Sequence, residues 1–167
     1  MQKTILLFIG LVWGLIANAQ EVKGYRGYVD LAVGDAYNFN TDQTISVNNM
    51  QWYSMISTTH GYAIGNWFVG AGVGYYHSYR DKENMCPVYA AGRYTIGNVK
   101  LNPYIDARAG IVYDPYWIET VQKFGALSVG LNVYKGLQVG LRGSIFTRPS
   151  RFFTANASVV LSYAFGK

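Results

Sequence analysis

The sequence predicts an all-β chain that folds as an eight-stranded antiparallel up-and-down transmembrane β-barrel. Three observations indicate this fold. The stretch 152–165 alternates apolar with small or polar residues, which is typical of a strand with one apolar and one polar face. Aromatic residues stand at both ends of that stretch, where a spanning strand meets the two membrane interfaces. Only 14% of the 167 residues are charged, whereas 15 are Tyr and 19 are Gly, which suits strands joined by tight turns.

Residues 1–19 have the features of a secretory signal peptide. Lys3 supplies a positive start, residues 5–16 are apolar, and residues 17–19 (Ala-Asn-Ala) match the small-x-small cleavage pattern. An apolar run of this length is too short to span a bilayer as a helix. We therefore expect an exported protein whose single domain, 20–167, is an outer-membrane β-barrel.

The remaining composition excludes several other classes. No later segment approaches 18 consecutive apolar residues, so only a closed barrel would let this chain span a membrane with its backbone groups satisfied. The formal net charge of +5 comes without a Lys/Arg-rich run, so nucleic-acid binding is not expected. The single cysteine, Cys86, cannot form an intramolecular disulfide, and we expect it to lie in a loop. No metal or other cofactor is expected, because no His, Cys, Asp and Glu residues show ligand spacing.

The first expected strand, 24–36, fixes which face of the wall is polar. Arg26 and Asp30 alternate with apolar residues such as Leu31. An arginine facing lipid at the midplane costs about 2–4 kcal/mol, so the charged face must line the lumen. The second strand, 51–62, carries no decisive charge on either face, and its register stays open.

The third and fourth strands continue the alternation. Three glycines occupy alternate positions within 70–74 of the third strand, 67–79. No helix is expected after them, so they indicate a lumenal stripe that leaves room for large side chains, and not a phosphate-binding loop. The fourth strand starts at Pro87, a position where strands tolerate proline, and turns Arg93 inward.

The fifth strand gives the clearest register in the chain. It starts at Pro103, and Asp106 and Arg108 alternate with small apolar residues, which places both charges in the lumen. The sixth strand, 123–134, puts a run of Leu and Val outward and Asn132 inward. Both strands therefore agree with a polar lumen and an apolar outer face.

The last two strands complete the predicted barrel. The two-residue connection 135–136 (Lys-Gly) predicts a tight hairpin. The seventh strand then starts at Leu137 and turns Gln138 and Arg142 inward, with Leu, Val and Ile outward. The eighth strand, 152–165, closes the barrel.

The connections and the aromatic residues support this count of strands. Long loops are expected near 38–49, 80–85, 114–122 and 147–151, and shorter turns near 63–66, 97–102 and 135–136. Outer-membrane barrels show this asymmetry. Antiparallel strands then collect the aromatics into two lipid-interface belts. The turn-side belt comprises Tyr25, Tyr62, Trp67, Tyr94, Tyr104, Tyr134, Tyr163 and Phe165. The loop-side belt comprises Trp52, Tyr53, Tyr75, Tyr79, Tyr89, Tyr113, Trp117, Phe124, Phe146 and Phe153.

A resemblance to a known group of proteins rests on the signal peptide and on the stretches 57–62, 67–74 and 103–110. These resemble small outer-membrane β-barrel proteins of Gram-negative bacteria, the porin-like families related to the OmpA/OmpX-type barrel. The resemblance implies the fold and the outer-membrane location. The ending Tyr163-x-Phe165 resembles the C-terminal signal read by the barrel-assembly machinery, although two residues follow it. The implied partners are outer-membrane lipids and, through those two aromatics, the assembly machinery.

The polar residues on the inward faces are expected to form a packed lumenal network. They are Arg26, Asp30, Arg93, Asp106, Arg108, Asn132, Gln138 and Arg142. An eight-stranded barrel is only wide enough for side chains to fill, so buried charges must pair. We therefore expect a structural, envelope or surface-interaction role exerted through extracellular loops. The aromatic segment 113–117 is a candidate contact for an unidentified extracellular partner. A narrow or gated channel is the alternative.

A lipid-modifying enzyme is a third hypothesis, because some eight-stranded outer-membrane barrels act on lipid A with His and Ser on a membrane-facing surface. His77 is expected to face outward near the loop side, but its neighbour Ser78 then points to the opposite face. His60 lies toward the turn side. No complete catalytic set emerges, so the sequence favours a protein that is not an enzyme. A soluble exported barrel is disfavoured because the charges lie on the predicted inner face.

Overall fold

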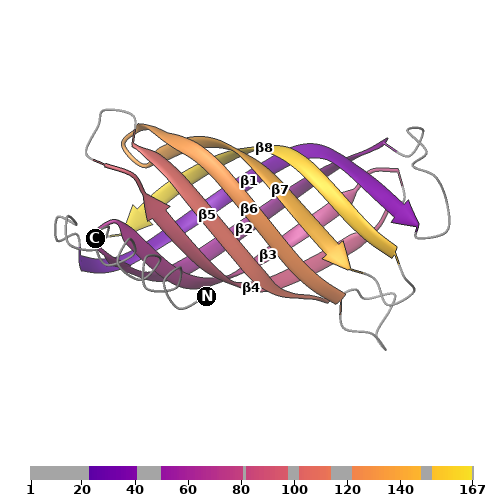
Figure 1. The fold of residues 1–167 in the computed structure, drawn as a ribbon, viewed down its shortest axis with the longest axis horizontal. Coiled ribbons are helices and arrows are strands. Elements are labelled where there is room, and N and C mark those ends of the chain that lie inside the picture. Colours follow the sequence, from indigo (N-terminus) through magenta and orange to yellow (C-terminus); the bar gives the residue numbers. More distant parts are fainter. Residues whose placement is uncertain are drawn as a thin grey trace, which may run out of the picture.

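The computed structural model describes residues 23–40, 50–80, 82–97, 102–113, 122–147 and 152–166. Eight strands occupy this part of the chain: β1 (Lys23–Asn40), β2 (Met50–Ile64), β3 (Trp67–Ser78), β4 (Asn84–Thr95), β5 (Pro103–Tyr113), β6 (Gln122–Tyr134), β7 (Leu137–Thr147) and β8 (Phe152–Gly166). Each strand pairs antiparallel with the next, and β8 pairs with β1 to close the barrel (Figure 1). The predicted fold class is confirmed. The predicted signal peptide lies outside the described residues.

The two faces of the wall follow the period-two pattern of the sequence. In β7 buried and exposed residues alternate at every position: Leu141 is 62% exposed, whereas its neighbour Arg142 is 2% exposed. The exposed set along the barrel is rich in Leu, Val and Ile, and the buried set holds Arg, Asp, Gln and Ser. A protein dissolved in water would have the opposite arrangement, so this outer wall is suited to lipid.

The register of β2, which the sequence left open, is set by its neighbours. Ser57 pairs with Asp30 of β1 and with Gly74 of β3. Tyr53 and Thr59 consequently point into the lumen with Ser57, while Trp52 and Ile56 point outward. The charge on β1 therefore decides the orientation of a strand that has no charge of its own.

The largest differences from the predicted strand boundaries are in β1 and β4. β1 continues to Asn40, because its last residues still pair with β8. β4 begins at Asn84 and not at Pro87, so Cys86 lies within a strand and not in a loop. Pairing between β3 and β4 is interrupted at Pro87, which has no N–H to donate, and it resumes at Met85. On the other side of β4, Pro87 pairs with Val112 of β5.

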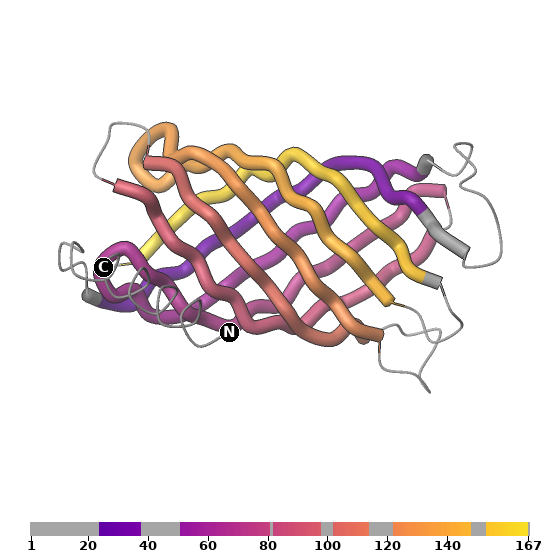
Figure 2. The backbone as a smooth tube through the Cα atoms, in the orientation of Figure 1, coloured from indigo at the N-terminus to yellow at the C-terminus, as the bar shows by residue number. Residues whose placement is uncertain are grey.

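The connections define two ends of the barrel. The turn end holds connections 65–66, 96–102 and 135–136, and the loop end holds 41–49, 79–83, 114–121 and 148–151. The strands run between these ends at an inclination to the long axis of the barrel (Figure 2). The turn-end connection 96–102 is longer than 148–151 at the loop end. The connections at the loop end are therefore longer overall mainly because of 41–49 and 114–121.

The hairpin between β6 and β7 has the geometry predicted from its two residues. The φ angles of Lys135 and Gly136 are 34° and 91°. A type I′ turn needs positive φ at both central residues, and its twist matches that of the flanking strands. The carbonyl of Gly136 also accepts a 2.8 Å hydrogen bond from the backbone N–H of Ala164, which ties the hairpin to β8.

No helix long and apolar enough to cross a membrane is found in the described ranges.

Candidate functional site

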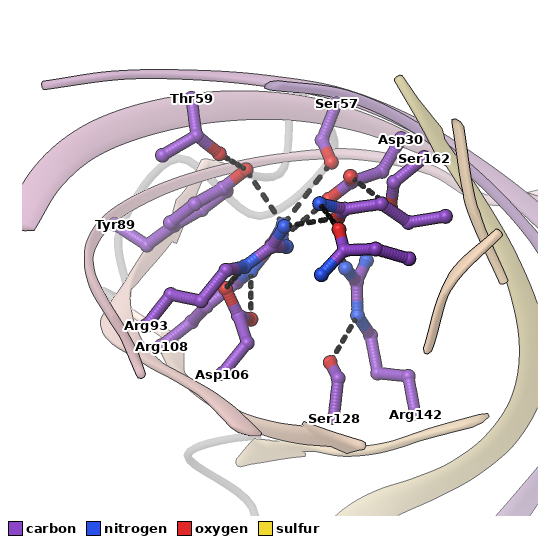
Figure 3. Close-up of polar contacts among 12 residues, drawn as sticks. Asp30, Ser57, Thr59, Tyr89, Arg93, Asp106, Arg108, Ser128, Arg142 and Ser162 are labelled. Atoms are coloured by element: carbon purple, nitrogen blue, oxygen red, sulfur yellow. Dashed lines mark hydrogen bonds and ion pairs between the residues drawn. The ribbon is translucent and has the colours of Figure 1, made fainter. Parts of the chain in front are cut away.

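Five charged side chains form a continuous chain across the middle of the lumen, named here the charge chain (Figure 3). Asp106 accepts hydrogen bonds from Arg93 Nε at 3.2 Å and from Arg108 Nε at 2.7 Å. Asp30 accepts from Arg108 Nη2 and, at 2.8 Å, from Arg142 Nη2. None of the five is more than 4% exposed. Because these residues come from β4, β5, β1 and β7, the ion pairs join opposite sides of the wall.

Neutral hydrogen bonds complete one end of the charge chain. Ser162 Oγ donates to Asp30 Oδ1 at 2.6 Å, so Asp30 has partners on both carboxylate oxygens. Arg142 Nε donates to Ser128 Oγ at 3.0 Å. Arg142 Nη1, in contrast, has no hydrogen-bond partner among the described residues. The three arginines of the chain face two aspartates, so the buried group carries an excess positive charge at this point.

The other end of the charge chain is held by aromatic rings and amides. The Arg93 guanidinium lies 3.9 Å from the ring centroid of Tyr28 and 4.3 Å from that of Tyr104. It also donates to Gln138 Oε1, and Gln138 Nε2 donates to Asn132 Oδ1. The electron-rich ring faces attract the cation and replace part of its lost hydration. Gln138 and Asn132, both predicted to be lumenal, thus extend the same network.

Tyr104 does not lie in the turn-side aromatic belt as predicted; its side chain is in the lumen and is 2% exposed. Glycines make room for it. A Cβ added to Gly130 or Gly140 would lie 2.6 or 2.7 Å from the Tyr104 hydroxyl oxygen. The alternation that turns Asp106 inward also turns Tyr104 inward, so strand parity is the better guide to its position.

Four aromatics assigned to the loop-side belt are also lumenal: Tyr53, Tyr89, Phe124 and Phe146 are each at most 4% exposed. Together with Tyr76 they form the aromatic layer. Ring centroids lie 4.9 Å apart for Tyr53–Tyr76, 5.1 Å for Tyr76–Phe146, 5.3 Å for Phe146–Phe124 and 5.6 Å for Phe124–Tyr89. Such pairs stabilise a core beyond their buried area. The lumen is therefore polar in its middle and aromatic toward the loop end, which corrects the expectation of a polar lumen throughout.

At the turn end the lumen widens into a polar cavity of about 450 Å³ lined by Arg26, Tyr28, Asn102, Asn132 and Gln138. Arg26 is half-buried and takes part in none of the ion pairs among the described residues. The other predicted lumenal residues are joined by hydrogen bonds, and Arg26 lines the opening beside them. The cavity ends where Gln138 meets Arg93.

The other predicted interface aromatics are on the outward face or outside the described residues. Tyr75, Tyr113, Tyr134 and Tyr163 are exposed, Trp67 and Phe165 are half-buried, and Trp117 lies outside the described residues. Trp67 packs against Tyr94 with ring centroids 4.7 Å apart. The Phe165 ring covers Gly27 and meets His60 edge-on at 5.7 Å.

A group of polar side chains near the loop end, on the outward face of β2, β3 and β4 and at Tyr79 directly after β3, was not predicted from the sequence. Asn84 Oδ1 accepts a 2.6 Å hydrogen bond from the Tyr75 hydroxyl and lies 2.8 Å from His77 Nδ1. Ser54 is the cross-strand partner of His77, and its hydroxyl bonds to the Tyr79 hydroxyl at 3.1 Å. We name these five residues the outer-wall polar cluster. Only the strand register reveals it, because neither Ser54 nor Asn84 is adjacent to His77 in the sequence.

The second outward histidine has a different environment. His60 Nδ1 bonds to the Tyr25 hydroxyl at 2.5 Å, and His60 Nε2 bonds to Thr58 Oγ1 at 2.9 Å. Both ring nitrogens therefore have protein partners. Within the described segments, no three His, Cys, Asp or Glu residues lie together in a way that would hold a metal ion.

A scan against protein-family models gives no match, and a search of curated proteins gives none either. Among solved structures the barrel is similar to the outer membrane enzyme PagL, with a TM-score of 0.63 and 12% identity over 81% of this chain and 98% of PagL. It is similar to Neisserial surface protein A (NspA), with a TM-score of 0.57 and 13% identity over 84% and 97%. It also matches Ail, the attachment invasion locus protein of Yersinia pestis, with a TM-score of 0.52 and 9% identity over 86% and 100%.

The fold, the apolar outer wall and the charged interior define a class: the eight-stranded outer-membrane β-barrel. The protein is located in the outer membrane, with its Leu, Val and Ile side chains toward lipid. At these levels of identity the three neighbours establish the shared fold, and they include both an enzyme and surface proteins.

Proposed function

We propose that this protein is a non-conducting outer-membrane barrel that acts through its outer wall and loop-end surface and not through a pore. The observation that carries the proposal is the filled lumen. The charge chain joins β1, β4, β5 and β7 across the middle, and the aromatic layer occupies the section toward the loop end. An eight-stranded barrel has no width to spare once such side chains are in place.

The loop end supplies the surface through which such a barrel would meet other molecules. Longer connections are typical of the extracellular side, which assigns 41–49 and 114–121 to the outside of the cell. Tyr113, the first residue of the aromatic segment 113–117 expected to contact an extracellular partner, is 58% exposed at the loop end of β5. The surface proteins NspA and Ail, which share the fold, support a surface role by analogy.

The first test is electrical. The purified barrel, inserted into planar lipid bilayers, is expected to give no step conductance, because the charge chain and the aromatic layer leave no continuous water path. A general porin in the same bilayers serves as the positive control. Reproducible conductance steps that change in size when Arg108 is replaced by Gln would contradict the proposal and establish the narrow-channel alternative.

We also propose that Tyr163 and Phe165 are contacted by the barrel-assembly machinery, and that lipids of the outer membrane contact the wall. Tyr163 is 54% exposed and points outward near the end of β8. After a pulse of synthesis, the variant Tyr163→Ala/Phe165→Ala is expected to contain several-fold more unfolded protein than the wild type. Unfolded barrel is measured on a gel as the band whose mobility does not change on heating. Tyr134→Ala, which removes an exposed aromatic from β6, is the control. Equal assembly rates for the two variants would rule out the assigned contact.

A further inference from the structure

We propose that the outer-wall polar cluster is a hydrolytic site for acyl esters of lipids in the outer leaflet. Ser54 is the nucleophile, His77 is the base, and Asn84 orients His77. The proposal deepens the proposed function and rests on it, since it requires the outer wall to be the working surface.

The hydrogen bond from His77 to Asn84 fixes which ring nitrogen of His77 carries the proton. Asn84 Oδ1 accepts hydrogen bonds and cannot donate one, so His77 Nδ1, 2.8 Å away, must carry the proton. The lone pair is then on Nε2, and no described residue forms a hydrogen bond with Nε2. An amide oxygen that holds a histidine in this tautomer is the orienting group of Cys-His-Asn hydrolases. His60, whose two ring nitrogens are both bonded to protein hydroxyls, has no such free position.

The nucleophile is supplied by the neighbouring strand. Ser54 of β2 lies directly opposite His77 of β3, and both point outward. Side chains opposite one another in an antiparallel pair have Cβ atoms about 4.5–5.5 Å apart, so Ser54 and His77 are neighbours on the outer wall, and the proposal requires Ser54 to rotate its hydroxyl toward Nε2. In the structure that hydroxyl bonds to the Tyr79 hydroxyl at 3.1 Å. Catalytic hydrogen bonds are often not yet aligned before a substrate is bound.

The location of the cluster identifies the class of substrate. Ser54 lies near the loop end of β2, His77 near the loop end of β3, and Asn84 begins β4. Exposed aromatic side chains such as Trp52 and Tyr113 mark the same level of the wall as a lipid interface. Lipid esters meet water at this depth of a bilayer, between the head groups and the acyl chains. An acyl ester of an outer-leaflet lipid therefore reaches the cluster without leaving the membrane.

The chemistry balances with water as the only co-reactant. Ser54 Oγ attacks the ester carbonyl carbon and passes its proton to His77 Nε2. The Tyr79 hydroxyl, 3.1 Å from Ser54 Oγ, is the neighbouring group that the proposal assigns to donate a hydrogen bond to the carbonyl oxygen. The bond to the alcohol oxygen breaks, and that oxygen takes the proton from Nε2. Water then attacks the acyl-Ser54 ester and gives a proton to Nε2, and the return of this proton to Ser54 releases a fatty acid and restores the site.

The test uses the full-length mature barrel in detergent–lipid micelles, with a fluorophosphonate probe and a fluorescent phospholipid ester as substrates. The wild type is expected to be labelled on Ser54 and to release the fluorescent fatty acid. Ser54→Ala is expected to lose labelling completely. His77→Ala is expected to slow both reactions by about 100-fold or more, the usual contribution of a general base. Ser78→Ala and His60→Ala are matched controls that change the inward serine and the fully bonded histidine.

The role of Asn84 as a positioning residue is tested by rescue. Asn84→Leu is expected to slow labelling about 10-fold, whereas Asn84→Asp, which keeps an acceptor oxygen at the same place, is expected to restore most of the rate. A heat-induced mobility shift on a gel confirms that each variant is folded. Absence of labelling and hydrolysis in the folded wild type overturns this proposal, as does labelling that is independent of His77. Conductance steps would instead contradict the proposed function, so the two failures are distinguishable.

Discussion

Replacing Asp30 with Asn is expected to lower the free energy of unfolding by about 3–5 kcal/mol, the cost typical of removing one partner from a buried ion pair. Asp30 accepts hydrogen bonds from Arg108, Arg142 and Ser162 and is fully buried. The amide of Asn carries no charge to offset the two guanidinium groups. Denaturant unfolding of the barrel in lipid vesicles, followed by tryptophan fluorescence, measures the loss.

Two further variants show whether the lost negative charge causes the loss of stability in Asp30→Asn. Asp30→Asn combined with Arg142→Gln restores the wild-type excess of one positive charge in the lumen, and it is expected to recover part of the lost stability. Asp35→Asn changes an outward carboxylate on the same strand, and it is expected to leave stability unchanged or to raise it, since a charge is removed from the lipid-facing wall. Equal losses for Asp30→Asn and Asp35→Asn would show that the charge chain contributes nothing specific.

Phe146→Ala is expected to destabilise the barrel by about 3–5 kcal/mol, the range for a large side chain deleted from a packed core. Phe146 is completely buried in the aromatic layer, with ring centroids 5.1 Å from Tyr76 and 5.3 Å from Phe124. Tyr76 on β3 and Phe124, the cross-strand partner of Phe146 on β6, are both anchored to a closed sheet, so neither can move far enough to fill the space. The same unfolding measurement in vesicles tests this expectation.

Ile145→Ala is the matched control for Phe146→Ala, because the two residues are adjacent on β7 and face opposite ways. Ile145 is 50% exposed on the outer wall. Lipid chains fill the space left by its side chain, so a smaller loss is expected. A larger loss for Ile145→Ala than for Phe146→Ala would mean that the aromatic layer does not stabilise the lumen.

Strand orientation could be predicted from the sequence where a charged residue shows which face of the strand lines the lumen. Arg26 and Asp30 on β1, and Asp106 and Arg108 on β5, cannot face lipid without a large cost, so their alternation fixes the orientation of each strand. β2 has no such residue. Its register depends on pairing with Asp30, which is a contact between strands and is not visible in the local pattern.

The aromatic residues show where prediction from the sequence failed. Tyr and Phe suit both an interface belt and a packed lumen, so their chemistry does not decide between outside and inside. Tyr104 and Tyr89 were assigned to belts from their height along the barrel, although the alternation of their own strands places them inside. The glycine stripe within 70–74 was expected to leave room for large side chains, but Tyr89 was not assigned to that room: a Cβ on Gly72 would lie 2.7 Å from the Tyr89 ring.

The candidate site was less predictable than the fold. The charge chain could be anticipated as a set of residues, but its order, from Arg93 through Asp106 and Arg108 to Asp30 and Arg142, depends on distances across the lumen. The outer-wall polar cluster was not anticipated at all. Its members come from β2, β3, the residue directly after β3, and β4, and the register of these strands brings them together.

The seam between β1 and β8 has a consequence for biogenesis. These two strands come from opposite ends of the described chain, yet they pair from Arg26 with Gly166 to Asn40 with Phe152. The Ser162 hydroxyl reaches Asp30 across the same seam. A polypeptide that has not yet been translocated through its final strand therefore has neither a complete wall nor a complete counter-ion shell around its arginines. Such a polypeptide is expected to stay unfolded until the final strand arrives.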